Sequence, residues 1–66
     1  MPRVYTARDL DEQAHALEAV LLNVNEVQTI NENQALAKGW ASMKIRERAY
    51  ELREQARVAR LDEVQP

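Results

Sequence analysis

The sequence predicts an all-α protein, an antiparallel hairpin of two long helices that assembles into a helical-bundle oligomer. Good helix formers dominate the 66 residues, with one glycine and two prolines, both at the ends of the sequence. Apolar residues recur at helical spacing in two separate segments. The chain also lacks cysteine, so the stability that chains this short require is expected from oligomerisation or from an idealised pair of helices.

The first helix is expected over residues 7–31, after a short arm of residues 1–5. Thr6 and Asp9 have the spacing of a capping box, in which each side chain bonds the backbone N–H of the other residue. An apolar stripe with steps of four and three residues follows, which is the pattern of one helix face. The stripe consists of Leu10, Ala14, Leu17, Leu21 and Val24.

The chain is expected to turn within residues 31–40, where two signals overlap. Asn31, followed by Gln34, has the spacing of a helix start, with Asn31 as the N-cap. Lys38 and Gly39 have the pattern of a helix end, with the glycine just after the last helical residue. Both signals can hold together, in which case a short helical piece lies between two breaks.

The second helix is expected over residues 41–61, inside a single helical domain of residues 6–62, with a frayed tail at residues 63–66. Its apolar seam has the same steps of four and three residues as the first stripe. Small residues predominate in this seam, which lets two helices approach closely. The seam consists of Ile45, Ala49, Leu52, Ala56 and Ala59.

The charges of the two halves differ in sign and predict which flanks of the helices meet. The first 35 residues carry a net charge of −4 and the last 31 carry +2, so the whole chain carries −2. Written as coiled-coil heptads, the first seam is flanked by Asp11 and Glu18, and the second by Arg53 and Arg60. An antiparallel arrangement would pair Asp11 with Arg60 and Glu18 with Arg53. Exposed pairs of this kind set orientation more than stability.

A row of arginines on the second helix is the candidate nucleic-acid site. Arginines along one helix face can follow phosphates, and a tyrosine can stack on a base. Acidic residues interleave with the row and the chain is acidic overall, which favours pairing with the first helix as the main use of these arginines. The row consists of Arg46, Arg53, Arg57 and Arg60, with Tyr50 on the same strip.

A further set of apolar residues has no partner within a two-helix hairpin and is the candidate protein interface. Such residues are either buried in an oligomer or exposed as a docking patch. We favour a homo-oligomer core, such as a four-helix assembly of two hairpins. The alternatives are a docking site for a second protein, anchored by Trp40 and Tyr50, and a local cap over one end of the hairpin. The set consists of Val20, Val27, Ile30, Leu36, Trp40, Met43 and Tyr50.

The sequence offers no catalytic site, and we expect no metal and no cofactor. Glu12 and His15 have the Glu-x-x-His spacing of di-iron helical bundles, but such a site needs further inward-facing acids. The acids of the second helix lie away from its seam. His15 is the only histidine and Gly39 the only glycine, which leaves no catalytic triad and no glycine-rich phosphate loop.

We therefore expect a small non-catalytic protein-binding module, such as an adaptor, an inhibitor or an antitoxin-like regulator. A nucleic-acid-binding regulator is the alternative. No run of about 18 apolar residues is present, so no membrane span is expected. The first nine residues lack the apolar core of a secretory signal, and together with the lack of cysteine this favours the cytoplasm.

Overall fold

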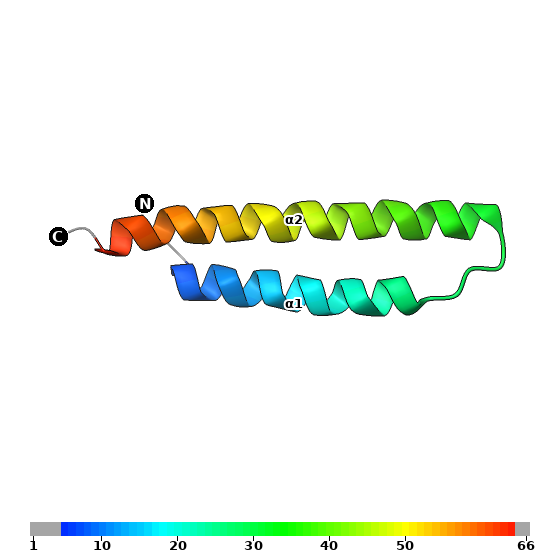
Figure 1. Cartoon of the computed structure of the whole chain (residues 1–66), viewed down its shortest axis with the longest axis horizontal. Coiled ribbons are helices and arrows are strands. Elements are labelled where there is room, and N and C mark those ends of the chain that lie inside the picture. The colour runs from blue at the N-terminus through cyan, green and yellow to red at the C-terminus, as the bar shows by residue number, and fades with distance from the viewer. Residues whose placement is uncertain (1–4, 65–66) are drawn as a thin grey trace.

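The computed structural model describes residues 5–64, which form two antiparallel helices joined by an extended connection (Figure 1). Helix α1 spans Ala7–Glu26 and helix α2 spans Glu32–Val64. The molecule is a rod with extents of 55 × 16 × 16 Å. Neither helix has a stretch apolar and long enough to cross a membrane. The predicted all-α hairpin is confirmed, whereas its assembly into an oligomer stays a prediction.

Helix α1 begins at the predicted capping box of Thr6 and Asp9. The hydroxyl of Thr6 accepts a hydrogen bond from the backbone N–H of Asp9 at 3.2 Å, and the carboxylate of Asp9 accepts one from the backbone N–H of Thr6 at 3.1 Å. A second carboxylate comes from the far end of α2, where Glu63 accepts a hydrogen bond from the N–H of Ala7 at 3.2 Å. These acids are favourable there because the first N–H groups of a helix have no partner within it.

The connection between the helices comprises residues 27–31, earlier than the turn predicted within residues 31–40. Helix α1 ends at Glu26 and not at residue 31, and Val27 is already extended, with φ −64° and ψ 125°. The segment contains neither glycine nor proline. Its side chains branched at Cβ lower the helix propensity, which favours the end of α1 at this point. The branched residues of the connection are Val27, Thr29 and Ile30.

Helix α2 begins at the predicted N-cap, Asn31. The side-chain oxygen of Asn31 accepts a hydrogen bond from the N–H of Gln34 at 2.8 Å. The side-chain oxygen of Gln34 in turn accepts one from the N–H of Ile30 at 3.0 Å, one residue before the position expected for a capping box. The short helical piece envisaged at the turn is therefore the first part of α2 itself.

The helix-end signal at Lys38 and Gly39 does not end a helix. Gly39 lies inside α2, and its φ is not positive, so the conformation that favours glycine at a helix end is absent there. Lys38 nevertheless bonds a carbonyl at a helix end, that of α1: its ammonium group donates to the carbonyl oxygen of Val27 at 2.7 Å. Lys38 therefore stabilises the end of α1, although it belongs to α2.

The C-terminal end of α2 also differs from the prediction. The helix runs through Val64 and not only to residue 61. The hydrogen bond from the N–H of Ala7 to the carboxylate of Glu63 ties this last turn to the start of α1. The predicted tail of residues 63–66 therefore begins later than expected, and residues 65–66 lie outside the described part of the chain. Residues 1–4 of the predicted arm lie outside it as well.

The core lies between the first half of α1 and the second half of α2 and consists mostly of small side chains. Both predicted seams face each other there, and Leu17 packs against the buried cluster as a partly buried neighbour. Leu21, Val24 and Ile45, nearer the connection, are only half-buried. The buried apolar residues are Ala7, Leu10, Ala14, Ala49, Leu52, Ala56 and Ala59.

Helix α2 has 33 residues and α1 only 20, so part of α2 has no helical neighbour (Figure 1). Two contacts fix the level at which α1 ends. The hydroxyl of Ser42 donates to the side-chain oxygen of Asn25 at 3.0 Å, and Lys38 reaches the carbonyl of Val27. The first turns of α2, before Lys38, therefore extend beyond α1 and have only the extended connection beside them.

Candidate binding surfaces

Along one side of the hairpin, the ion pairs predicted from the heptad pattern connect α1 and α2. Arg53 donates two hydrogen bonds to the carboxylate of Glu18, at 3.0 and 2.6 Å, and Arg60 donates one to Asp11. Arg53 also lies 3.8 Å from the carboxylate of Asp11, so that one guanidinium group connects two acids of α1. Both predicted pairs, and the antiparallel orientation that they imply, are confirmed.

The contact between Arg53 and Glu18 shifts the titration of both groups. Hydrogen bonding from Arg53 is the main reason that the pKa of Glu18 lies below its ordinary value; desolvation opposes this shift, and the charges of Arg53 and His15 add to it. The same hydrogen bonds raise the pKa of Arg53. Because the side chains of Arg53 and Glu18 are 46% and 45% exposed, solvent screening keeps the contribution of the pair to stability small.

The candidate nucleic-acid row provides little free positive charge. Arg53 and Arg60 bond the acids of α1, and Arg57 donates a hydrogen bond to Glu54 at 3.1 Å. Arg46 is exposed, and no ion pair joins it to another residue of the described chain. Three of the four arginines therefore have a carboxylate partner within the hairpin, as the interleaved acids suggested.

All seven residues of the candidate protein interface are exposed. Their exposed fractions range from 46% for Val20 to 86% for Ile30, although large apolar side chains are usually found inside proteins. Contiguous exposed apolar residues mark binding surfaces in soluble proteins. The other five members are Val27, Leu36, Trp40, Met43 and Tyr50.

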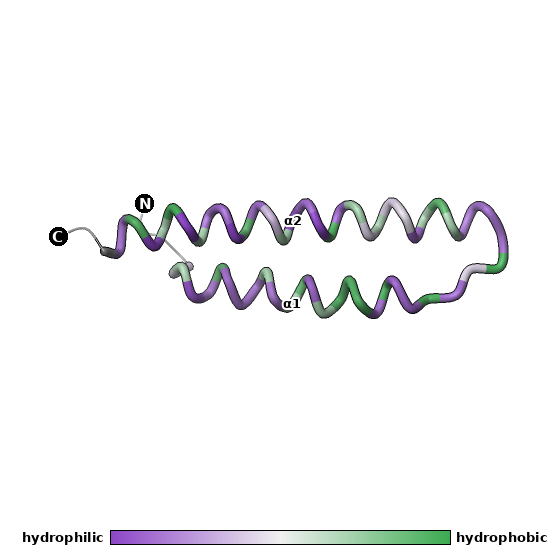
Figure 2. Tube along the Cα trace, viewed as in Figure 1, coloured by the Kyte–Doolittle hydropathy of each residue, from purple (hydrophilic) through white to green (hydrophobic). Residues whose placement is uncertain are grey.

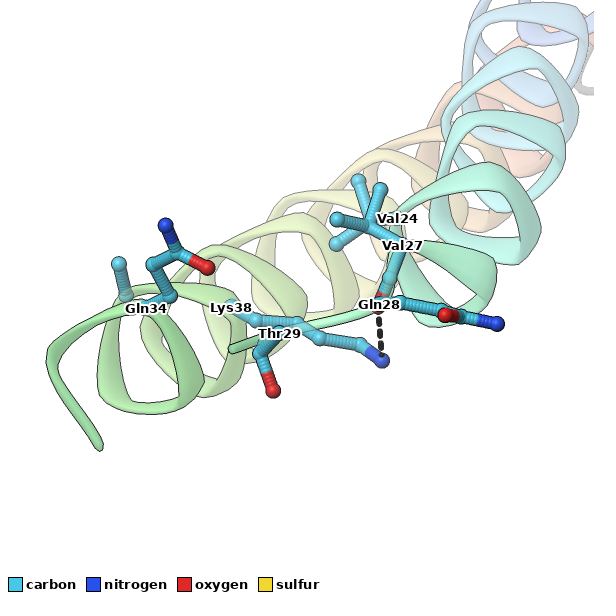
Figure 3. Close-up of a pocket in the computed structure, with 7 residues that line it drawn as sticks. Val24, Val27, Gln28, Thr29, Gln34 and Lys38 are labelled. Carbon is cyan, nitrogen blue, oxygen red and sulfur yellow. Dashed lines mark hydrogen bonds between the residues drawn. The ribbon is translucent and has the colours of Figure 1, made fainter. Parts of the chain in front are cut away.

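Two of these seven residues line depressions in the surface. Val20 lines a shallow groove of about 380 Å³ between the helices, with Arg48 on its α2 side. Val27 lines a second pocket, of about 320 Å³, beside the connection (Figure 3). Neither depression includes Trp40 or Tyr50, the aromatic residues of the set. That the seven residues act together as one interface stays a prediction.

The pocket at the connection is mostly apolar. The side chain of Lys38 stretches from α2 to the connection, where its ammonium group meets the carbonyl of Val27 (Figure 3). No acid and no histidine line this pocket, and its one cation, the ammonium group of Lys38, is already bonded to the carbonyl of Val27. It is lined by Val24, Val27, Gln28, Thr29, Gln34, Ala37 and Lys38.

Four residues of α2 near the connection share one helix face, and we call them the Trp40 surface: Leu36, Gly39, Trp40 and Met43. Their spacing of i, i+3, i+4 and i+7 places them on neighbouring turns. The indole of Trp40 is 62% exposed, and the ammonium group of Lys44 lies over it, 5.9 Å from the ring centre, which is a cation–π contact. Hydrophobic and neutral residues prevail in this part of α2, and hydrophilic ones toward its C-terminus (Figure 2).

Leu22 is a further exposed apolar residue that the heptad assignment left aside. It directly follows Leu21 of the first seam, so the two leucines point about 100° apart around the helix, at 3.6 residues per turn. Leu21 is half-buried, and Leu22 is 65% exposed. One neighbouring helix cannot cover two consecutive leucines. The pair Leu21 and Leu22 was therefore the sequence pattern from which an exposed leucine could have been predicted.

The residues with metal-binding spacing lie on a mixed-charge surface. In the described part of the chain, no three side chains of the types His, Cys, Asp and Glu come together so as to hold a metal ion. Glu12 and His15 line a shallow groove that contains three arginines and two acids, and the arginines neutralise the carboxylates there. The other residues that line it are Arg8, Asp11, Arg53 and Arg60.

Comparisons with known proteins add no relative. The sequence and the structure were compared with protein families, with curated proteins and with solved structures, and none of them matches this chain.

Proposed function

We propose that this protein is a small non-catalytic binding module, of the kind that serves as an adaptor, an inhibitor or an antitoxin-like regulator, and that it works as a homo-oligomer through its exposed apolar and aromatic residues. The observation that carries the proposal is the exposure of large apolar side chains, above all Trp40 at 62%. Each Å² of apolar surface removed from water stabilises a complex by about 25 cal/mol. A partner that covers these residues therefore has a large driving force available.

The polar groups of the hairpin support binding over catalysis. An active site needs polar groups that converge on one point in a cavity. Here many of the described charged side chains form ion pairs along the rod, while the pocket at the connection and the groove at Val20 are mainly apolar. These two depressions offer contact area to a partner, and neither is lined by an acid, a histidine or a cysteine.

A nucleic-acid-binding regulator is the weaker candidate. Arg46 and Tyr50 lie one turn apart on α2 and are both exposed, which gives one cation and one stacking ring. Binding to mixed RNA and to duplex DNA should be tested at about 50 mM salt, where phosphate contacts are strong. Absence of binding under that condition would remove this candidate.

The mass of the protein in solution and the emission of Trp40 test the main proposal together. Trp40 is the only tryptophan, so its fluorescence reports on one surface. As the concentration rises from nanomolar to micromolar, the mass measured by light scattering should increase from one chain to at least two, and the emission should shift to the blue as the indole leaves water. A folded monomer whose emission stays that of an indole in water throughout would contradict the oligomer.

Replacement of Trp40 tests whether the exposed aromatic surface carries the binding. Tryptophans at the centre of interfaces commonly contribute about 2 kcal/mol or more, so Trp40→Ala should weaken assembly by a factor of about 30. Leu61→Ala is the matched control, because Leu61 is similarly exposed, at 55%, but lies near the other end of α2. Equal assembly of both variants would show that Trp40 merely covers the helix.

A further inference from the structure

We propose that a second copy of this chain covers the Trp40 surface. The two α2 helices cross antiparallel there, and each Trp40 packs on the bare backbone at Gly39 of the other copy. This inference rests on the proposed function, since it takes self-association as given. It adds the face on which the copies meet and the residues that meet.

A single hairpin does not explain why residue 39 of α2 is a glycine. It is the eighth residue of α2, its φ is not positive, and a Cβ placed on it would meet nothing within 4 Å. Glycine inside a helix is less favourable than alanine, because it loses more conformational freedom on folding. No conformation and no contact within the chain requires a glycine here. Close approach of another chain is the remaining physical use of the missing side chain.

The neighbours of Gly39 form the walls of a hole around it. Residues at i, i+3, i+4 and i+7 on one helix enclose the space that receives a side chain from a facing helix. Leu36, Trp40 and Met43 occupy three of these positions and are 65%, 62% and 48% exposed, while Gly39 occupies the fourth and leaves that corner open. The surface is therefore shaped to accept a large side chain.

The same surface also supplies the side chain that fits this hole. A two-fold axis between residues 39 and 40 would set Trp40 of each copy against Gly39 of the other, and Leu36 of each against Met43 of the other. A dimer with two-fold symmetry requires a patch that complements itself. A hole and a large aromatic residue side by side on one helix meet that requirement, which favours a second copy over an unrelated protein.

The charge distribution along α2 agrees with this position for the contact. Residues 33–43 contain one charged residue, Lys38, and its ammonium group is bonded to the carbonyl of Val27. The next eleven residues, 44–54, contain seven charged residues. Interface cores are depleted of charge, and two identical helices repel least where they carry none. The contact therefore belongs near the connection and not in the second half of α2.

The chain exposes more area than a compact protein of its size, so a second copy has area to cover. A compact monomer of 7.6 kDa exposes about 4,300 Å², whereas this chain exposes 5396 Å². The excess, roughly 1,100 Å², is distributed along the rod, because a single hairpin covers only one stripe of each helix. For comparison, each partner buries roughly 800 Å² in a standard interface.

Introduced cysteines test which residues meet. The chain has no cysteine, so Leu36→Cys and Met43→Cys each add a single thiol. Mixed and oxidised, the two variants should form disulfide-linked pairs of one Leu36→Cys chain with one Met43→Cys chain, in clear excess over like pairs. A disulfide needs Cα atoms within about 7 Å, so the excess reports direct contact. Val58→Cys mixed with Leu61→Cys is the control and should show no such excess.

Substitution of Gly39 gives a second test, because it should have different effects on an isolated hairpin and on the proposed dimer. In an isolated hairpin Gly39→Leu meets open space and improves helix propensity, so it should not weaken the protein. In the proposed dimer the leucine fills the place of the indole, and the dimer dissociation constant should rise about tenfold or more in sedimentation experiments. Gln55→Leu, at an exposed position farther along α2, should leave it unchanged.

The outcomes separate this inference from the proposed function. A dimer that gives no excess of Leu36→Cys with Met43→Cys pairs, and whose dissociation constant is unchanged by Gly39→Leu, overturns the proposed face while the binding function stands. A chain that remains monomeric at micromolar concentration, with Trp40 in water, overturns both. Preferential cross-linking together with weakened association of Gly39→Leu supports both.

Discussion

Arg53 links the two helices near the middle of the hairpin, since its guanidinium group reaches Glu18 and Asp11 of α1. Its partner Glu18 is the described acid whose titration responds most clearly to the fold. A carboxylate whose pKa is lower in the folded chain than in the unfolded one stabilises the fold only while it is charged. The contact between Arg53 and Glu18 should therefore make part of the stability of this hairpin depend on pH.

Acid is expected to weaken the fold through Glu18. Its folded pKa lies below the ordinary value of 4.5, so its contribution is complete above about pH 4.5 and is lost as the pH falls through the folded pKa. Glu18→Gln keeps the shape but removes this titration. Thermal unfolding followed by circular dichroism should therefore show a weaker pH dependence below pH 4.5 for Glu18→Gln than for the parent. Identical dependence would mean that other carboxylates govern the acid response.

The ends of the helices are set by contacts that the sequence shows only in part. The capping signals at Thr6 and Asn31 were predicted, because a side-chain oxygen three residues before a free N–H suffices to recognise them. The end of α1 was placed wrongly, because the lysine and glycine typical of a helix end lie inside α2. Lys38 acts across the connection on Val27, and such a contact depends on the fold and not on neighbouring residues.

The N-cap residue of α2, Asn31, should contribute measurably to the free energy of unfolding of the hairpin. Asn31→Ala removes the oxygen that accepts the N–H of Gln34 and should cost about 0.5–2 kcal/mol in urea unfolding. Asn33→Ala, two residues later inside α2, is the comparison and should change stability far less. A cost of Asn31→Ala no larger than that of Asn33→Ala would show that the connection does not need this cap.

The seam between the helices should resist larger side chains. Ala56 is fully buried, so Ala56→Leu forces the helices apart and should destabilise the hairpin by about 1–3 kcal/mol. Ala16→Leu adds the same atoms at an exposed position of α1 and is the control. Comparable unfolding midpoints for the two variants would mean that the helices do not approach as closely as the buried alanines indicate.

For the molecule as a whole, the apolar residues of the candidate interface were predictable but their arrangement was not. Helical periodicity gives the angle of each side chain around its own axis, which identified Trp40 and Met43 as residues outside the seam. It does not give how far the other helix extends, and the early end of α1 leaves the start of α2 without a helical neighbour. Trp40 is therefore exposed near the connection, whereas Val20 lines the groove between the helices.

The melting temperature should rise with protein concentration. No large side chain of the described residues is fully buried, so a single hairpin has a small core, and the proposed dimer would add buried surface to it. When a dimer unfolds to separate chains, each tenfold increase in concentration stabilises it by about 1.4 kcal/mol. Circular dichroism melts at concentrations a hundredfold apart should therefore differ clearly. Superimposable melts would indicate that the hairpin unfolds as a monomer.

The hydrogen bond between Glu63 and Ala7 has a consequence for the order of the helices along the chain. It brings the end of α2 within 3.2 Å of the start of α1, so the free ends of the two helices are neighbours. A circular permutant that opens the connection after Gln28, and bridges residues 64 and 6 with a short glycine-rich linker, should keep the seam and all three interhelical ion pairs of Arg53 and Arg60. The hairpin is thus compatible with either genetic order of its two helices, and insertions at either end of the rod should be tolerated more easily than insertions within a helix.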